Sequence, residues 1–315
     1  MSRPAETRAT TCYRLAAGAA TLAPALAHAT STAPALPWWA WPILLFATTF
    51  VLGIIAVVGG IGGGVLFVPI VGGFFPFHLD FVRGAGLLLA LCGSLASGPA
   101  LLRSGLANLR LAMPLALTGS VGGIFGALIG LALPTRLIQV ALGTTVLLIA
   151  LLMWWTRNSA RTDSHPADAW AIALGLHGTF HDPALGRDVD WKAHRTASGL
   201  AAFFGIGIVG GLFGLGAGWA NVPALNLLMG IPLKLAVGTS GLAISIVNTS
   251  AGWVYMNKGA LLPILHVPSI LGVMLGARVG VRLLKRIKPS SALRLVIAVL
   301  VAAGVRSLMQ GFDFQ

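Results

Sequence analysis

The sequence predicts an all-α polytopic membrane protein built as two inverted repeats, each with a hairpin that contains a broken or short helix and three transmembrane helices. Three observations support this fold class. Of the 315 residues, 57% are apolar and 9% are charged, and the mean hydropathy is +0.88, a composition typical of membrane proteins. Apolar runs of about 20 residues, enough to cross about 30 Å of hydrocarbon, recur at short intervals. The sequence also matches itself at an offset of 154 residues.

The N-terminal residues resemble a targeting segment. Three arginines precede a short apolar stretch that ends at Ala27, and Ala27-His28-Ala29 fits the small-x-small pattern of a cleavage site. An uncleaved tail is the alternative, since prolines interrupt the segment. Residues 1–41 are therefore assigned to a signal-like leader and a polar N-terminal segment.

Apolar runs from residue 42 onward are expected to form membrane helices. A backbone in lipid must satisfy its own hydrogen bonds, and the period-2 alternation of a barrel is absent, so these runs are expected to be helical. Two of them, 65–76 and 219–229, are short and follow glycine clusters, which predicts half-helices or short tilted helices. The remaining helices are expected at 42–58, 82–102, 111–132, 136–156, 196–213, 237–256, 261–283 and 291–310.

The internal match has no gaps. Gly60–Pro69 (GIGGGVLFVP) superposes on Gly214–Pro223 (GLGAGWANVP), and the register continues to the match of Pro114 with Pro268. A register of this length is typical of a duplication. The chain is thus divided into a first membrane repeat at 42–156, a connecting segment at 157–195 and a second membrane repeat at 196–315.

Basic residues predict the orientation of the repeats. Lys and Arg gather at 282–288 and in the 157–195 segment, so both are expected in the cytoplasm. They lie on one side only if residues 196–229 enter the membrane and return as a hairpin broken at the glycines. Each half then has a hairpin and three crossings, an odd number, so the halves are inverted and the N-terminus lies outside. This build is typical of secondary transporters, whose site lies where the broken elements meet.

Charge and cysteine content exclude several other functions. The net charge of +13 does not indicate nucleic-acid binding, because the 21 Lys and Arg are spread over short gaps between apolar runs. Cys12 and Cys92 are too few and too differently placed for a disulfide framework or a thiolate metal site. The histidines and aspartates of 157–195 lack the spacing of a metal site. We expect no metal and no cofactor, with the lipid bilayer and a small anion as partners; a homo-oligomer stays open.

Two motifs resemble those of a known family. With the glycine run Gly60–Gly64 before Val68-Pro69, its echo at Gly214–Pro223, and the Ala236–Ser240 segment (AVGTS), the chain resembles the TauE/SafE sulfite exporter family over residues 42–310. The resemblance implies a bacterial inner-membrane transporter linked to export of sulfite, sulfonates and related sulfur compounds. The sequence departs from the family pattern at Ala217, Trp219 and Asn221 in the second repeat and at Arg83-Gly84-Ala85-Gly86 in the first.

The two glycine clusters carry the predicted substrate site. Each precedes a short helix, and a helix N-terminus in the membrane presents free N–H groups and a positive dipole end, which suit an oxyanion. Asparagine at mid-span adds donors without charge. Arg83 and Lys234 follow the short hairpin arms and are candidate anion-attracting residues, although such side chains usually reach headgroups. The candidate substrate-binding residues are Gly62, Gly63, Gly64, Val65, Ser94, Ser97, Gly216, Ala217, Gly218, Trp219, Asn221, Asn248 and Thr249.

The predicted spans contain no Asp or Glu, which favours an anion as the substrate. The resemblance implies that this anion is a small sulfur oxyanion, such as sulfite, thiosulfate or an organosulfonate, moved outward. An anion channel is the alternative that the sequence leaves open. An intramembrane serine hydrolase of Ser240 and His266 is disfavoured, because the expected depths of these residues differ by roughly 15 Å. No enzymatic activity is expected. Isolated glycines only let helices approach, so Gly130→Ala is expected to matter little.

Overall fold

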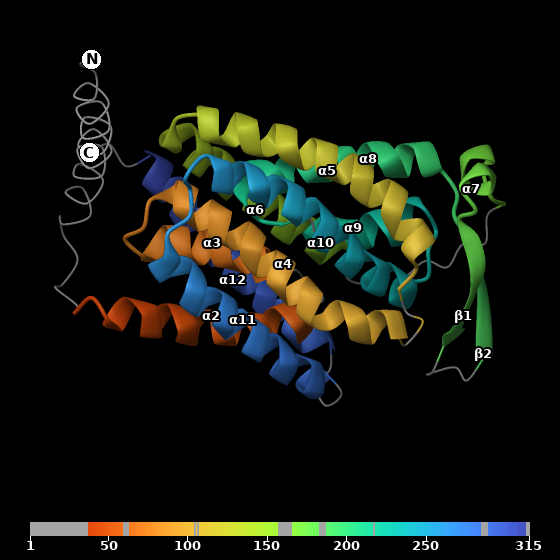
Figure 1. The fold of residues 1–315 in the computed structure, drawn as a ribbon, viewed down its shortest axis with the longest axis horizontal. Helices are drawn as coiled ribbons and strands as arrows, with labels where there is room; N and C mark the ends of the chain where they lie inside the picture. The colour runs from red at the N-terminus through yellow and green to blue at the C-terminus, as the bar shows by residue number, and fades with distance from the viewer. Residues whose placement is uncertain are drawn as a thin grey trace, which may run out of the picture. The chain divides into compact units, whose positions relative to one another are not determined.

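The computed structural model describes residues 37–58, 63–103, 105, 107–156, 166–182, 187–216, 218–284 and 289–312. The helical bundle belongs to the unit Trp41–Gln315 (Figure 1). The helices of the first half are α2 (Ala40–Val58), α3 (Gly63–Phe74), α4 (Leu79–Arg103), α5 (Leu109–Ala132) and α6 (Thr135–Thr156). Those of the second half are α8 (Thr196–Phe213), α9 (Gly218–Pro223) with the π-helical η1 (Ala224–Leu228), α10 (Leu233–Asn257), α11 (Pro263–Leu284) and α12 (Pro289–Phe312).

Length and composition make the chain a multi-pass membrane protein. Within the described residues, α4, α5, α6, α8, α10 and α11 each contain a span long and apolar enough to cross a membrane. Shorter apolar helices lie in α2, α3 and α12. The helix predicted at 196–213 is found with the same bounds, and the two short runs form α3 and α9 with η1.

Local sequence explains several helix ends. Asn108 caps α5, because its Oδ1 accepts a hydrogen bond from the N–H of Leu111 at 3.0 Å. Pro263 occupies the first position of α11, where its missing N–H leaves no intrahelical bond unmade. Gly214 ends α8 with a φ of +69°, in the left-handed region that favours glycine.

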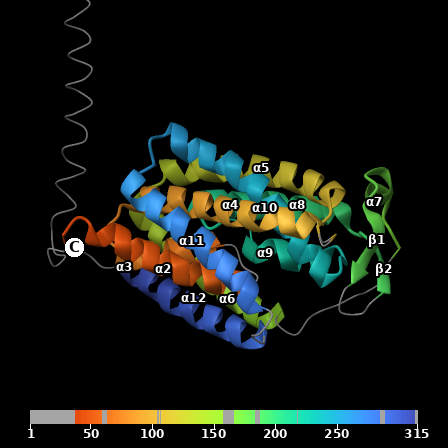
Figure 2. The same cartoon turned by 60° about the horizontal axis from the view of Figure 1, so that its bottom comes forward.

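Glycine contacts hold neighbouring helices together. A Cβ at Gly122 in α5 would overlap the carbonyl oxygen of Phe204 in α8, and a Cβ at Gly207 would overlap that of Gly119. In the same way, a Cβ at Gly276 in α11 would overlap a backbone carbonyl of α2. The α5–α8 and α2–α11 pairs therefore depend on small residues, as is common between membrane helices. Figure 2 shows α2 beside α11 and α12 beside α6.

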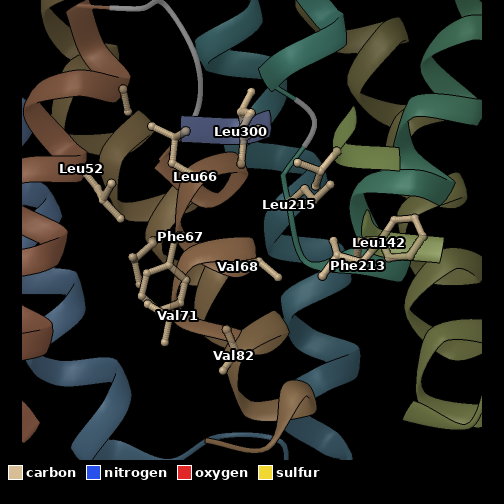
Figure 3. Close-up of a cluster of buried hydrophobic side chains, with 14 of the residues drawn as sticks. Leu52, Leu66, Phe67, Val68, Val71, Val82, Leu142, Phe213, Leu215 and Leu300 are labelled. Atoms are coloured by element: carbon tan, nitrogen blue, oxygen red, sulfur yellow. The ribbon is translucent and has the colours of Figure 1, made fainter. Parts of the chain in front are cut away.

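An apolar cluster surrounds α3. Figure 3 shows Leu66, Phe67 and Val68 of α3 in this cluster together with Phe213 and Leu215 from the second half. All three α3 side chains are fully buried. The first short helix is thus embedded in an apolar core to which both halves contribute.

The segment between the two halves contains strands that the sequence did not predict. Here α7 (Ala169–Ala173) precedes an antiparallel hairpin of β1 (His177–Asp182) and β2 (Arg187–Lys192), and Figure 1 shows these elements together at one end of the bundle. Phe180 and Trp191 are buried against residues of α8, η1 and α10. The all-α prediction therefore holds for the bundle but not for this segment, where alternation of exposed Asp190 with buried Trp191 favours a strand.

Candidate functional site

The glycine breaks of the two hairpins lie against each other. A Cβ atom at Gly64, in the first turn of α3, would lie 2.7 Å from the carbonyl oxygens of both Gly86 and Leu215. Real side chains do not come this close, so only glycine permits the approach. Leu215 belongs to the turn after α8. The start of α3 therefore touches the break in the second hairpin.

The turn after α8 places an asparagine beside this contact. Gly214 and Gly216 have φ angles of +69° and +70°, which favour glycine. A Cβ at Gly216 would lie 2.9 Å from the Cβ of Ala90 and 3.1 Å from the Nδ2 of Asn248. The Asn248 side chain thus lies directly against the turn, one residue along the chain from the contact with Gly64.

Two asparagines carry buried carboxamides without partners. Asn221 in α9 is 0% exposed and Asn248 in α10 is 1% exposed. Neither their Nδ2 nor their Oδ1 atoms have a hydrogen-bond partner among the described residues. An unpaired buried polar group costs about 1–3 kcal/mol, and such groups in native proteins usually meet a water, an ion or a ligand. Asn248, beside the turn, is the clearest candidate for a ligand-binding side chain.

The second hairpin returns through a distorted helix. α9 has six residues and continues into the five-residue π-helical turn η1, a kind of turn that is frequent at functional sites. The Nδ2 of Asn226 donates to the carbonyl oxygen of Ile231 at 2.8 Å, at the end of η1. Trp219 packs against both large apolar clusters, and its Nε1 is buried without a partner in the described part of the chain. Polar atoms of this arm therefore remain available to a ligand.

Arg83 is buried and its charge is offset. It is 1% exposed and forms an ion pair with Asp80, one turn earlier in α4. Its Nη1 donates to the carbonyl oxygens of Leu212 at 2.9 Å and Gly130 at 3.1 Å, near the C-terminal ends of α8 and α5, where helix dipoles favour a cation. The ring of Tyr255 lies 5.7 Å from the guanidinium. These contacts join α4 to the ends of α5 and α8.

Two expectations from the sequence are corrected here. The span Leu79–Ala96 contains Asp80, because α4 begins earlier than predicted and an acidic residue in the first turn suits a helix N-terminus. The spans are thus not free of carboxylates. Gly130→Ala is also not harmless, since a Cβ at Gly130 would lie 2.7 Å from the carbonyl oxygen of Leu212 and 2.9 Å from Arg83 Nη1.

Other predicted residues have partners of their own or lie at the periphery. The hydroxyl of Ser94 donates to the carbonyl oxygen of Leu91 at 2.8 Å, and that of Thr249 to Ser245 at 2.7 Å, so both bond within their own helices. Thr249 and Lys234 are exposed. Gly63, Gly64 and Val65 form the start of α3, and Gly218 begins α9. Gly62 and Ala217 lie outside the described residues, as does the side chain of Ser97.

A comparison with known families finds one that covers most of the chain. The sequence profile described as Sulfite exporter TauE/SafE matches residues 45–307. This range contains both glycine clusters and every helix from α3 to α11. No solved structure matches the chain.

Curated relatives agree with this match. The chain is 25% identical over 278 residues to "Probable membrane transporter protein YunE" of Bacillus subtilis (strain 168), covering 84% of this chain and 98% of the relative. It is 28% identical over 275 residues to "Probable membrane transporter protein ORF9" of Sinorhizobium sp, covering 84% and 91%. "Probable membrane transporter protein YdhB" of Bacillus subtilis (strain 168) is 22% identical over 244 residues, covering 76% and 89%.

Proposed function

We propose that this chain, which belongs to the sulfite exporter TauE/SafE family, is a secondary transporter that exports a small sulfur oxyanion, such as sulfite, thiosulfate or an organosulfonate, across the bacterial inner membrane. That the protein is a multi-pass membrane transporter follows from its helices and its family. The observation that carries the finer proposal is the buried carboxamide of Asn248, which has no hydrogen-bond partner among the described residues and lies beside the contact of Gly64 with Leu215. No enzymatic role is proposed.

Packing between the two halves supports an inverted repeat. Gly53 in α2 packs on the backbone of Val273 in α11, and Gly207 in α8 packs on that of Gly119 in α5. The offset of 154 residues relates one contact to the other, because it takes Gly53 to Gly207 and Gly119 to Val273. The first helix of each half thus packs on the fourth helix of the other, as a two-fold relation requires. With a hairpin and three crossings in each half, as the sequence predicts, the number of crossings is odd, and we infer that the two-fold relation is an inversion.

The proposed substrate site lies where the two hairpins meet. We place the anion at the N–H groups of Gly63–Val65, which begin α3, and at those of Gly216, Gly218 and Trp219, because the start of a helix carries a positive dipole end. Gly62 and Ala217, which the sequence also predicts for the site, lie outside the described residues. Asn248 and Asn221 add neutral donors that bind an anion without trapping it. Arg83 is left out of this site because Asp80 and backbone carbonyls already offset its charge.

The choice of an anion follows from the balance of charge. Among the described residues of the spans, the carboxylate of Asp80 is engaged by Arg83, so it does not serve to offset a desolvated cation. An inside-negative membrane potential expels an anion with about 2.3 kcal/mol per charge per 100 mV. Export therefore needs no coupling ion.

We place the connecting segment in the cytoplasm and the N-terminus outside, as the distribution of Lys and Arg predicts.

Flux measurements in liposomes test this proposal. Purified full-length protein should move labelled sulfite, thiosulfate or sulfoacetate, with saturation and counterflow. Asn248→Leu should lose most of this flux, whereas Asn257→Leu, at the exposed end of the same helix, should not. Transport confined to cations would contradict the proposal, and flux without saturation or counterflow would indicate the anion channel instead.

A further inference from the structure

One face of α11 carries two buried polar groups that the proposed substrate site does not use. The side chains of His266 and Ser269 are 6% and 0% exposed, and His266 Nε2 and Ser269 Oγ have no hydrogen-bond partner among the described residues. The other ring nitrogen of His266, Nδ1, lies 2.8 Å from the carbonyl oxygen of Leu262 and 3.2 Å from the backbone nitrogen of the same residue, so it can donate to the first or accept from the second. When Nδ1–H donates to this carbonyl, Nε2 is an acceptor with a free lone pair.

The same face of α11 reaches the start of α3. His266, Ser269 and Val273 follow one another at spacings of three and four residues, which places them on one side of the helix. At Val273 this side touches α3, because a Cβ at Gly63 would lie 3.1 Å from the Cγ2 atom of Val273. Ser269 and His266 thus lie about one and two turns, or about 5 and 10 Å, along α11 from the proposed substrate site.

The neighbouring helices leave His266 without a free acid as counter-charge. α11 packs on α2, α3 and α4, and neither α2 nor α3 has a titratable side chain. On α11 itself, Arg278 is exposed, and Arg282 is the other charged residue. Asp80 is paired with Arg83, and α2, α3, α4 and α11 contain no other carboxylate, so an anion at the start of α3 would supply the charge that balances a protonated His266. The titratable residues of α4 are Asp80, Arg83, Cys92 and Arg103.

We propose that His266 and Ser269 form a proton-binding site, and that His266 takes up one proton when the oxyanion binds at the start of α3. This inference rests on the proposed function. The proton comes from solution and adds to the lone pair of Nε2, while Nδ1–H stays on the Leu262 carbonyl. The imidazolium then carries one positive charge, and the hydroxyl of Ser269, on the same face of α11, is a dipole without a partner among the described residues that can turn its oxygen toward that charge. By linkage, the anion and the proton strengthen each other's binding by the same factor.

Calorimetric titration of thiosulfate into the purified full-length chain tests the proton site. Thiosulfate does not change its own charge near neutral pH, so any proton taken up belongs to the protein. In two buffers of different ionisation enthalpy, the unchanged protein should take up a fraction of a proton, at most one, per anion. Its affinity should fall, by at most tenfold per pH unit, between the pKa of His266 in the free protein and the higher pKa in the complex. His266→Gln should bind without proton uptake at all pH values, and His78→Gln, at an exposed position, should match the unchanged protein.

The outcomes separate the proton site from the proposed substrate. Proton uptake and pH dependence that survive in His266→Gln would overturn the proton site. If the unchanged protein binds no sulfur oxyanion, the proposed substrate class is wrong. The proton site is then tested separately, by NMR of the His266 ring in the free protein. Nitrogen chemical shifts that show a proton on Nε2 of the neutral ring would overturn the proton site, because the free lone pair that the proposal requires would be absent. If His266→Gln does not fold, Ser269→Ala should move the midpoint of the pH dependence to lower pH, and an unchanged midpoint would contradict the proposal.

Discussion

The second arms of the two hairpins occupy equivalent sequence positions but differ in structure and chemistry. α3 is one continuous helix of 12 residues, whereas α9 has six residues and passes into a π-helical turn. At the offset of 154 residues, Phe67 of α3 corresponds to Asn221 of α9, and Ser94 corresponds to Asn248. Phe67 is embedded in the apolar cluster, while both asparagines are buried without partners in the described part of the chain.

This difference indicates that the two halves contribute differently to the proposed site. The first half supplies a rigid, packed helix whose N-terminus is fixed by contact with Gly86 and Leu215. The second half supplies the polar side chains and the distorted backbone. Under the proposed function the site would be asymmetric, because the described residues of α3 are apolar, whereas Asn221 of α9 is a buried polar group without a partner in the described part of the chain.

Loss of the buried guanidinium of Arg83 should have the largest effect on stability. Arg83 binds the Leu212 carbonyl just before the break of the second hairpin, and the equivalent position in the second half is the exposed Val237. Arg83→Gln takes the guanidinium donors from the carbonyl oxygens of Leu212 and Gly130, which should lower the free energy of unfolding by about 1–3 kcal/mol for each carbonyl. Thermal unfolding in detergent measures this, with exposed Arg110→Gln as the control. An equal, small shift for both variants would show that the first half does not anchor the second hairpin.

A side chain at the hairpin contact should cost somewhat less stability but abolish transport. Gly64→Val forces the backbone of Gly86 or Leu215 to move, at a cost of about 3 kcal/mol. Flux in liposomes and the yield of monodisperse protein report the two effects. Gly205→Val serves as the control, since nothing lies within 4 Å of a Cβ at that position. Normal flux through folded Gly64→Val would contradict a site at the meeting of the two hairpins.

Substitutions in the two arms should separate binding from packing. Asn221→Leu removes a donor to the anion, so substrate binding should weaken by about 1–3 kcal/mol while stability of the free protein does not fall. Phe67→Leu at the equivalent position should lower stability by about 1 kcal/mol and leave binding unchanged. Calorimetry measures substrate binding by each of the two variants, and thermal unfolding measures the stability of each. If both variants weaken substrate binding, or both lower stability, the two arms do not have the different roles proposed for them.

The smallest effect is expected where the connecting segment joins α8. Asp168 caps α7 and accepts hydrogen bonds from the N–H of Thr196 at 2.9 Å and from its hydroxyl at 2.7 Å. Burial acts to raise the pKa of Asp168, but the hydrogen bonds from Thr196 and Ala171 outweigh it and lower the pKa below its ordinary value. Among the described residues, no equivalent carboxylate binds the start of the first helix of the first half.

Stability should therefore depend on pH in one direction. A carboxyl whose pKa is lowered on folding stabilises the folded state above its unfolded pKa, and this contribution is lost as the pH falls through the folded pKa. Asp168→Ala should cost about 1 kcal/mol near neutral pH, typical of a lost helix cap, and the difference should vanish in acid. Unfolding at several pH values measures this. A difference that persists at the lowest pH would assign the effect to packing instead.

The helices could be predicted from the sequence because apolar length alone specifies a membrane span. The register of the repeat also placed the glycine breaks, and Gly64 and Leu215 do lie in contact. The pairing of Arg83 could not be predicted, since its carbonyl partners Gly130 and Leu212 lie 47 and 129 residues away. The same holds for the strands β1 and β2, whose short alternating pattern is weak beside the strong apolar signal of the helices. The lack of room for a Cβ at Gly130 could not be predicted either, because it results from tertiary contacts with Leu212 and Arg83.

The most direct test is to locate a bound oxyanion by its scattering. A selenium analogue of the substrate, such as selenite in place of sulfite, soaked into crystals of the full-length chain gives an anomalous peak that marks the anion without reference to flux. The proposed site predicts one peak at the start of α3, within hydrogen-bond distance of the Nδ2 atom of Asn248, and its loss in Asn248→Leu. A peak elsewhere, with the Asn248 carboxamide bonded to protein atoms instead, would contradict the site at the meeting of the two hairpins.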